Sequence, residues 1–143
     1  MKIHAAECRR RFSAQQVARL ATSGPDGPHV VPIVFALESD TIVFAVDHKP
    51  KTTRRLKRLS NLEHDSRCTV LVDHYDDDWS QLWWVRADAI GTISDEPADI
   101  EWAARLLARR YEQYVAVPPQ GPVVRLQVQR WSGWAARPLD HSA

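Results

Sequence analysis

The central part of the chain alternates between apolar runs and turn residues, as antiparallel strands do. Between residues 17 and 46 lie VARLAT, HVVPIVFAL and TIVFAV, separated by Gly24-Pro25-Asp26-Gly27 and by Glu38-Ser39-Asp40. β-Branched and aromatic residues at short intervals, with such turns between them, are typical of hairpins. Further runs are CTVLVDH at 68–74, a long strand or bulged pair in WSQLWWVRADAIGTI, and the alternating PVVRLQVQRW. The pattern predicts a mainly β protein with antiparallel strands.

Three segments have helical patterns instead. A first helix is predicted over residues 5–19, and a second follows Thr52 or Thr53, either of which can cap it. The third begins at Ser94-Asp95-Glu96-Pro97 and is predicted to run from about Pro97 to Tyr114. Apolar residues at helical spacing indicate which positions face the core. These positions are Phe12, Val17, Leu20, Leu56, Leu59, Leu62, Ala103, Leu106, Leu107 and Tyr114.

Length and composition fit one domain over residues 1–143. The chain is 44% hydrophobic and 26% charged, and no repeat, low-complexity segment or Gly/Ser linker divides it. Six or so antiparallel strands with two inserted helices predict a small closed barrel.

Positive charge is concentrated in one segment. Six of the ten residues from Lys49 to Arg58 are Lys or Arg, and no acidic residue lies between Asp47 and Leu62. The rest of the chain has 13 basic and 18 acidic residues, a net charge of −5, although the whole chain carries +1. A focused basic segment suits a small phosphorylated ligand better than a nucleic acid, whose backbone needs many spread contacts. A solvated helix face is the alternative, above all for Lys57 and Arg58.

Cysteines and hydropathy bear on the compartment. Cys8 and Cys68 have no CxxC partner, which is typical of a reducing environment. The first residues, MKIHAAECRRRF, contain no apolar signal region, and no apolar run reaches membrane-spanning length. We therefore expect a cytoplasmic protein without a membrane partner.

The motifs of common catalytic machinery are missing from the sequence. The five glycines form neither GxGxxG nor a P-loop, and neither HExxH nor GxSxG occurs. Asp73, His74 and Asp76–Asp78 could coordinate a cation, but a hydrated acidic turn is the simpler interpretation. No catalytic residue or metal ligand is assigned, although Arg86, Tyr75 and His74 could donate a proton or anchor a substrate. Such a protein could rely on a cofactor that carries the chemistry itself.

The order of these segments resembles the split β-barrel flavin-binding superfamily typified by pyridoxamine 5′-phosphate oxidase. The resemblance rests on VARLATSGPDGPHVVPIVFALESDTIVFAVD, the Lys-bearing turn and NLEHDSRCTVLVD, and the closing VQRWSGW extends it to nearly the whole chain. KPKTTRRLKRL and HYDDDWSQLWWVRAD are similar to the actinobacterial branch of F420-dependent enzymes. The resemblance implies a six-stranded antiparallel split β-barrel, a homodimer, and hydride transfer between reduced F420 and a small organic acceptor.

The resemblance also implies where the cofactor binds. In relatives of this kind the cofactor phosphates sit at the turn after the third strand, held by basic residues and backbone N–H groups. That turn corresponds here to Lys49, Lys51 and Thr52, with Arg54 or Arg55. A helix N-terminus beside lysines is also physically suited to an anion. The ring would lie over the strands, on residues whose alternative role is barrel core: Val31, Pro32, Ile33, Ala45 and Val46.

One departure from the family pattern bears on the cofactor. Relatives of the pyridoxamine oxidase type carry an arginine on the second strand that meets the FMN phosphate, whereas this chain has Val30-Val31 there. The departure favours F420, whose longer acidic tail could use the basic helix. An FMN-dependent enzyme and a flavin- or F420-binding protein without turnover stay open as alternatives, since no proton donor is evident.

Six tryptophans in so short a chain indicate interfaces or ring-binding surfaces. Trp79, Trp83 and Trp84 are predicted to alternate in one strand, with one side in the core and the other a dimer or ligand wall. Trp79 is also expected to contact the cofactor. Trp131 and Trp134 lie near the C-terminus, where relatives of this fold approach the partner subunit's cofactor site. For any single tryptophan a dimer interface is the first expectation.

Overall fold

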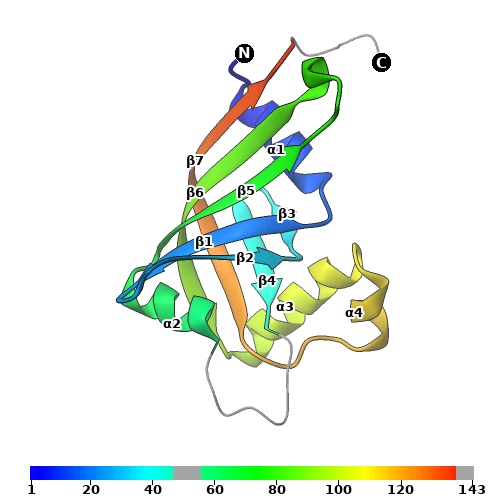
Figure 1. Cartoon of the computed structure of the whole chain (residues 1–143). Coiled ribbons are helices and arrows are strands. Elements are labelled where there is room, and N and C mark those ends of the chain that lie inside the picture. Colours follow the sequence, from blue (N-terminus) through cyan, green and yellow to red (C-terminus); the bar gives the residue numbers. More distant parts are fainter. Residues whose placement is uncertain (47–55, 138–143) are drawn as a thin grey trace.

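The computed structural model describes residues 1–46 and 56–137. Within these ranges the chain forms four α-helices, a 3₁₀ helix and seven strands (Figure 1). In chain order they are α1 (Ala5–Ser13), β1 (Ala18–Gly24), β2 (Gly27–Ile33), β3 (Ala36–Glu38), β4 (Thr41–Ala45), α2 (Lys57–His64), β5 (Arg67–His74), η1 (Trp79–Gln81), β6 (Trp83–Ser94), α3 (Pro97–Ala108), α4 (Glu112–Ala116) and β7 (Val123–Ala135).

The described strands form one antiparallel sheet in the order β2-β1-β5-β6-β7-β4-β3. The prediction of a mainly β fold with inserted helices is confirmed. The prediction of six strands closed into a barrel is wrong, because the sheet has seven strands and its edges, β2 and β3, do not pair with each other.

A tyrosine bonds the link between the two edge strands. Phe35, between β2 and β3, donates its backbone N–H to the Tyr111 hydroxyl at 3.1 Å instead of to a strand. The same hydroxyl lies 3.0 Å from the Phe35 carbonyl and 2.8 Å from the Gln16 carbonyl, and it can donate to one of them. Arg110 also donates to the carbonyls of Ser13 and Gln15. The corner between α3 and α4 therefore bonds the β2–β3 link and the segment between α1 and β1.

Although it is open, the sheet coils around one core. In Figure 1, β1 and β2 cross β4, β6 and β7 at a steep angle. Side chains from both parts of the sheet belong to a single buried cluster, which α1 and α2 complete. Among its members are Phe12, Leu20, Phe44, Leu59, Leu62, Val70, Val85 and Leu126.

Strand β4 is buried on both faces. Ile42 and Phe44 point into the main core, whereas Val43 packs with Leu107 of α3 in a second cluster. All three residues are at most 2% exposed. The continuous apolar run TIVFAV reflects this double burial, because a strand covered on both sides does not alternate.

Two predicted helices are shorter than expected. The helix predicted over residues 5–19 ends at Ser13, because the chain from Ala18 pairs with both β2 and β5 and tertiary pairing overrides a weak helical pattern. Leu20 is buried as predicted, but from a strand, and Val17 is 41% exposed. The helix predicted to end near Tyr114 stops at Ala108, since Tyr111 takes an extended conformation to bond Phe35.

Most of the other residues predicted to face the core are buried. Leu59, Leu62, Ala103, Leu106 and Leu107 are buried as predicted, and Leu56 and Tyr114 are half-buried. Thr52 and Thr53 lie outside the described residues.

The segment with three tryptophans is not one continuous strand. The sequence predicted either a long strand or a bulged pair. β6 has features of both, because it is a single strand from Trp83 with a register shift at Asp88/Ala89. Trp79 lies in η1 and not in the strand; Asp78 caps η1 by accepting from the Ser80 N–H. In the described ranges, no helix combines the length and the apolar character needed to cross a membrane.

Candidate functional site

β4 leads directly into the basic segment. Its end is held by the Val46 N–H, which donates to the Pro122 carbonyl at 3.0 Å. Gly121 makes this approach possible, because a Cβ at Gly121 would lie 2.9 Å from the Val46 carbonyl oxygen. Val46 is 9% exposed and Ala45 is half-buried. The chain therefore enters the basic turn from a position fixed against the segment that precedes β7.

The turn itself lies within residues 47–55, outside the described ranges. The predicted phosphate-binding residues Lys49, Lys51, Thr52, Arg54 and Arg55 all belong to it and remain predictions.

The three predicted ring contacts on β2 do not face the same way. Ile33, 6% exposed, and the half-buried Val31 pack in or against the main core. Pro32 between them points to the opposite face and is exposed. Within one subunit, a cofactor ring could therefore contact either Val31 and Ile33 on the inner face of β2 or Pro32 on the opposite face, but not all three. Val31 and Ile33 also fill the core, which was the alternative role expected for them.

α2 is anchored to the β1–β2 hairpin by a buried amide. Asn61, 1% exposed, donates from Nδ2 to Thr22 Oγ1 at 3.0 Å. Gly24 permits the close approach, since a Cβ there would lie 2.0 Å from Asn61 Oδ1. At the start of the helix, Lys57 Nζ lies 2.5 Å from Asp26 Oδ2 in the hairpin turn. These contacts determine which side of the basic helix faces the hairpin.

Two side chains in this region bury nitrogens that have no hydrogen-bond partner in the described parts of the chain: Arg58 Nε and His29 Nδ1. Arg58 precedes Asn61 by three residues, so both lie on the helix face that packs on the hairpin. His29 is paired with Thr22 across the hairpin and shares its inward face. Buried polar atoms without partners are uncommon and cost free energy. Together they provide a cation and a second polar group where α2 meets the hairpin, and an anionic ligand could complete their bonding.

The sequence left Arg58 open between an anion-binding role and a solvated helix face. Its spacing from the buried Leu62, four residues later, was the signal that would have placed it on the inner face. His29 had no such signal, because its burial depends on pairing with β1 and on the position of α2.

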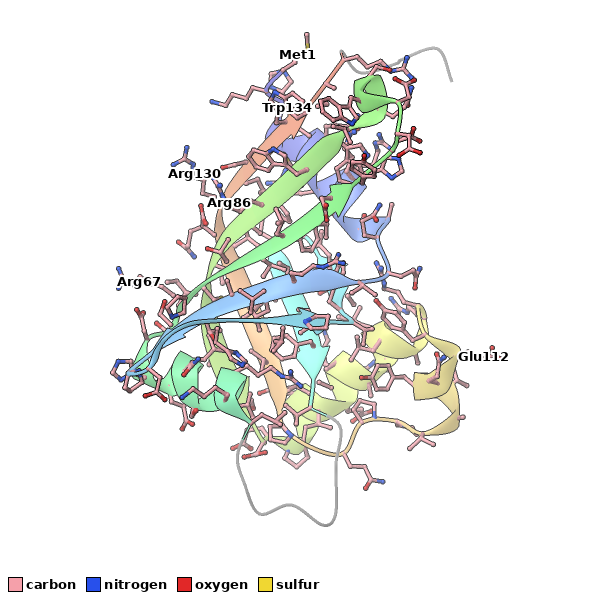
Figure 2. The ribbon with its side chains drawn as sticks, viewed as in Figure 1. Met1, Arg67, Arg86, Glu112, Arg130 and Trp134 are labelled. Atoms are coloured by element: carbon pink, nitrogen blue, oxygen red, sulfur yellow. The ribbon has the colours of Figure 1, made fainter. Side chains whose placement is uncertain are left out.

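The other candidate residues lie at the opposite end of the sheet. His74, Tyr75 and Arg86 line a groove of about 420 Å³, which Leu71, Asp73, Leu82, Trp83, Trp84 and Trp134 complete. Figure 2 shows Trp134 at this end. Trp79, four residues before β6, is 68% exposed.

The separation between the two ends follows from the strand register. Ala45 pairs with Val123 of β7, and Val123 pairs with Ser94, the last residue of β6. The groove lies at Trp83, the first residue of β6. The strand between them spans roughly 35 Å. Within one subunit, the groove therefore lies far from Ala45, the last residue of β4.

The described residues offer little for thiol or metal chemistry. Burial raises the pKa of Cys68 to about 12 and also raises the pKa of Cys8, which disfavours a thiolate at neutral pH. In residues 1–46 and 56–137, no group of three or more His, Cys, Asp or Glu side chains could hold a metal ion. In the acidic turn, Asp76 Oδ1 accepts from the Asp78 N–H at 2.8 Å, so this carboxylate bonds within its own turn.

Comparison with known proteins identifies the family. The family model of pyridoxamine 5′-phosphate oxidase matches residues 5–135, and the chain belongs to this family. Among curated proteins, none matches the chain.

Solved structures show the same fold at low identity. A conserved hypothetical protein from Mycobacterium tuberculosis superposes with a TM-score of 0.77 at 22% identity, covering 99% of this chain and 91% of that one. A FAD-binding protein from Mesorhizobium loti gives 0.70 at 19% identity, with 93% of each chain covered. The haem storage protein HutZ from Vibrio cholerae gives 0.69 at 15% identity, covering 92% of this chain and 93% of HutZ.

The unpaired Arg58 leads to a stability prediction. Arg58→Met keeps the methylene packing and removes the unsatisfied nitrogen, so it should leave the free energy of unfolding of the ligand-free protein unchanged or raise it by up to about 1 kcal/mol. Urea unfolding would measure this. Arg105→Met is the matched control, because Arg105 is exposed on α3 and pairs with Glu101 at 3.1 Å. A loss of stability at Arg58 well beyond that of the control would show that the buried Nε has a partner.

Proposed function

We propose that this protein binds the deazaflavin F420 and is an oxidoreductase that transfers hydride between the reduced coenzyme and a small organic acceptor. Membership of the pyridoxamine 5′-phosphate oxidase family supports a flavin-type cofactor, as does the fold shared with a FAD-binding protein. The observation that carries the choice of F420 is the pair of buried nitrogens of Arg58 and His29, where α2 meets the hairpin, which have no hydrogen-bond partner among the described residues. They extend the anion-binding capacity beyond what one terminal phosphate uses.

The residues of the chain fit a long anionic group. Lys49, Lys51, Thr52 and Arg55 would hold the phosphodiester, and Arg58 would meet the acidic tail further along α2. Lys57 is less available, because it already pairs with Asp26. When bound, F420 supplies the hydride at C5 of its ring. The role of the protein is then to orient the ring and to keep water away from it. Of the predicted ring contacts, Val31, Ile33 and Val46 pack in or against the main core, whereas Ala45 packs against the second cluster.

Two alternative functions would use the same site. FMN could occupy the same turn through a single phosphate, with the nitrogens of Arg58 and His29 left to water. A binding protein without turnover is compatible with the same site, and the fold is shared with a haem storage protein.

We also propose that the functional unit is a homodimer. The outer face of β5, β6 and β7 exposes Leu71 and Trp134 by 37% and 38%. Charges of both signs surround them, from Arg86, Asp73 and Asp88. Such a mixed face can be complementary to itself across a two-fold axis. If Trp79 contacts the cofactor, a dimer is required, because one subunit holds Trp79 and Ala45 at opposite ends.

The cofactor proposal predicts an order of affinities. F420 should bind more tightly than FMN, because its longer anionic tail reaches more cations. Lys51→Ala should weaken F420 binding by about 1–3 kcal/mol, the range for a charge-assisted contact. Fluorescence titration would measure both ligands. Arg105→Ala, on the exposed side of α3, serves as the control and should change neither affinity. Protein from a host that makes FMN but not F420 should be colourless, and stoichiometric FMN that F420 cannot displace would instead establish the flavin alternative.

The dimer proposal predicts a mass in solution of twice the 16.3 kDa of the chain. Leu71→Arg should produce monomers, because a buried, unpaired cation at the centre of the interface is costly. Val115→Arg is the matched control, since Val115 is 64% exposed on α4, away from this face. Light scattering at micromolar concentration distinguishes the states. A monomeric wild-type protein would contradict the proposal, as would equal dissociation in both variants.

A further inference from the structure

A second, polar pocket lies on the inner face of the sheet, at the end opposite to Ala45 and Val46. Its volume is about 340 Å³, within the range of small-molecule sites. Three regions distant in sequence meet there: the end of α1, the turn around η1, and the end of β7. It is lined by Arg11, Gln15, His74, Ser80, Gln81, Leu82, Trp83, Ala135 and Arg137. No Asp or Glu is among these residues.

The strand register places the pocket on the inner side. His74 pairs with Trp83, and Trp83 pairs with Ala135, so the three side chains share one face. Val85, two residues after Trp83, is fully buried on that same face. The outer face proposed as the dimer interface is the opposite one, although His74, Leu82 and Trp83 also line the groove on that face.

Trp83 holds two nitrogen-bearing groups in place. The Arg11 guanidinium lies over the Trp83 indole, 5.2 Å from the ring centroid. The His74 ring stacks on the same indole at 6.2 Å, with 20° between the planes. Arg11 Nε donates to Glu7 Oε1 at 2.9 Å, and the Arg11 side chain is only 16% exposed. The guanidinium is therefore fixed before any ligand arrives, which reduces the entropy lost on binding.

The charges around the pocket leave positive charge uncompensated. Glu7 is shared by Arg10 and Arg11, so these three groups sum to one positive charge. Arg137 adds a second cation, and the nearby Asp78 carboxylate, which also accepts from Ser80, opposes it. The terminal amino groups of Arg11 make no hydrogen bond within the described residues, and these are the groups that bind carboxylates in a bidentate manner.

We propose that this pocket binds a small organic carboxylate, with the carboxylate on Arg11 and Arg137 and the apolar part of the ligand against Trp83 and Leu82. The polar rim of Gln15, Ser80 and Gln81 would accept or donate the remaining hydrogen bonds. The inference stands apart from the cofactor proposal, because the pocket shares no residue with the basic turn or with α2.

Isothermal titration calorimetry with sodium benzoate tests this site, with ionic strength held constant by sodium chloride. Benzoate should bind saturably with one site per chain. Arg11→Gln should weaken binding by about tenfold or more, the loss expected for a charge-assisted hydrogen-bonded pair. Arg137→Gln, at an exposed position that cannot disturb the core, should weaken it several-fold.

The control variant replaces another arginine whose guanidinium lies over the ring of a different tryptophan. Arg125 lies over Trp102 at 4.4 Å and pairs with Thr92 near the other end of β6, so Arg125→Gln removes an equivalent cation outside the pocket and should leave benzoate affinity within about twofold. Sodium phosphate, which has no apolar part, should bind more weakly than benzoate. The proposal is overturned by an absence of saturable benzoate binding, by equal losses in Arg11→Gln and Arg125→Gln, or by phosphate binding as tightly as benzoate.

Discussion

The double burial of β4 is the constraint on which the rest of the structure depends. Its inner face closes the main core and its outer face carries α3, so the strand cannot shift in register without exposing one of them. Asp40 fixes its start, accepting from Arg9 Nε at 2.7 Å and Trp131 Nε1 at 2.9 Å. These two donors hold the pKa of Asp40 below its ordinary value, so this contribution to stability is present above that value and is lost as acid protonates the folded carboxylate. With Val46 tied to Pro122 at the other end, the basic turn begins at a fixed point.

Much of the fold was predictable because it depends on local patterns. The turn at Gly24–Gly27, the strands after it and the stripe formed by Leu59 and Leu62 all follow from spacing and residue type. The early end of the third helix comes from a long-range contact. Tyr111 leaves the helical conformation and bonds the backbone at Phe35, 76 residues earlier in the chain. No local pattern contains that contact.

In the candidate site, too, features set by the local sequence were predictable, whereas features that depend on tertiary contacts were not. The cluster of cations from Lys49 to Arg58 is visible in the sequence, and so is the family resemblance. The unpaired nitrogens of Arg58 and His29 arise only when Asn61 locks α2 onto the hairpin, and the placement of Trp79 far from Ala45 emerges only from the sheet register. Buried polar groups left unpaired cost stability, and such costs are expected where a site is prepared for a ligand.

The central claim is that α2 and the turn before it bind a polyanionic cofactor tail through several cations. The dependence of affinity on salt tests this most directly, because each exposed cation–anion contact is screened. Dissociation constants for F420 and FMN would be compared from about 50 mM to about 500 mM sodium chloride. The account predicts that F420 binds more tightly at low salt and that its advantage over FMN shrinks steadily as salt rises. An affinity ratio that does not change with salt, or one that favours FMN throughout, would contradict it.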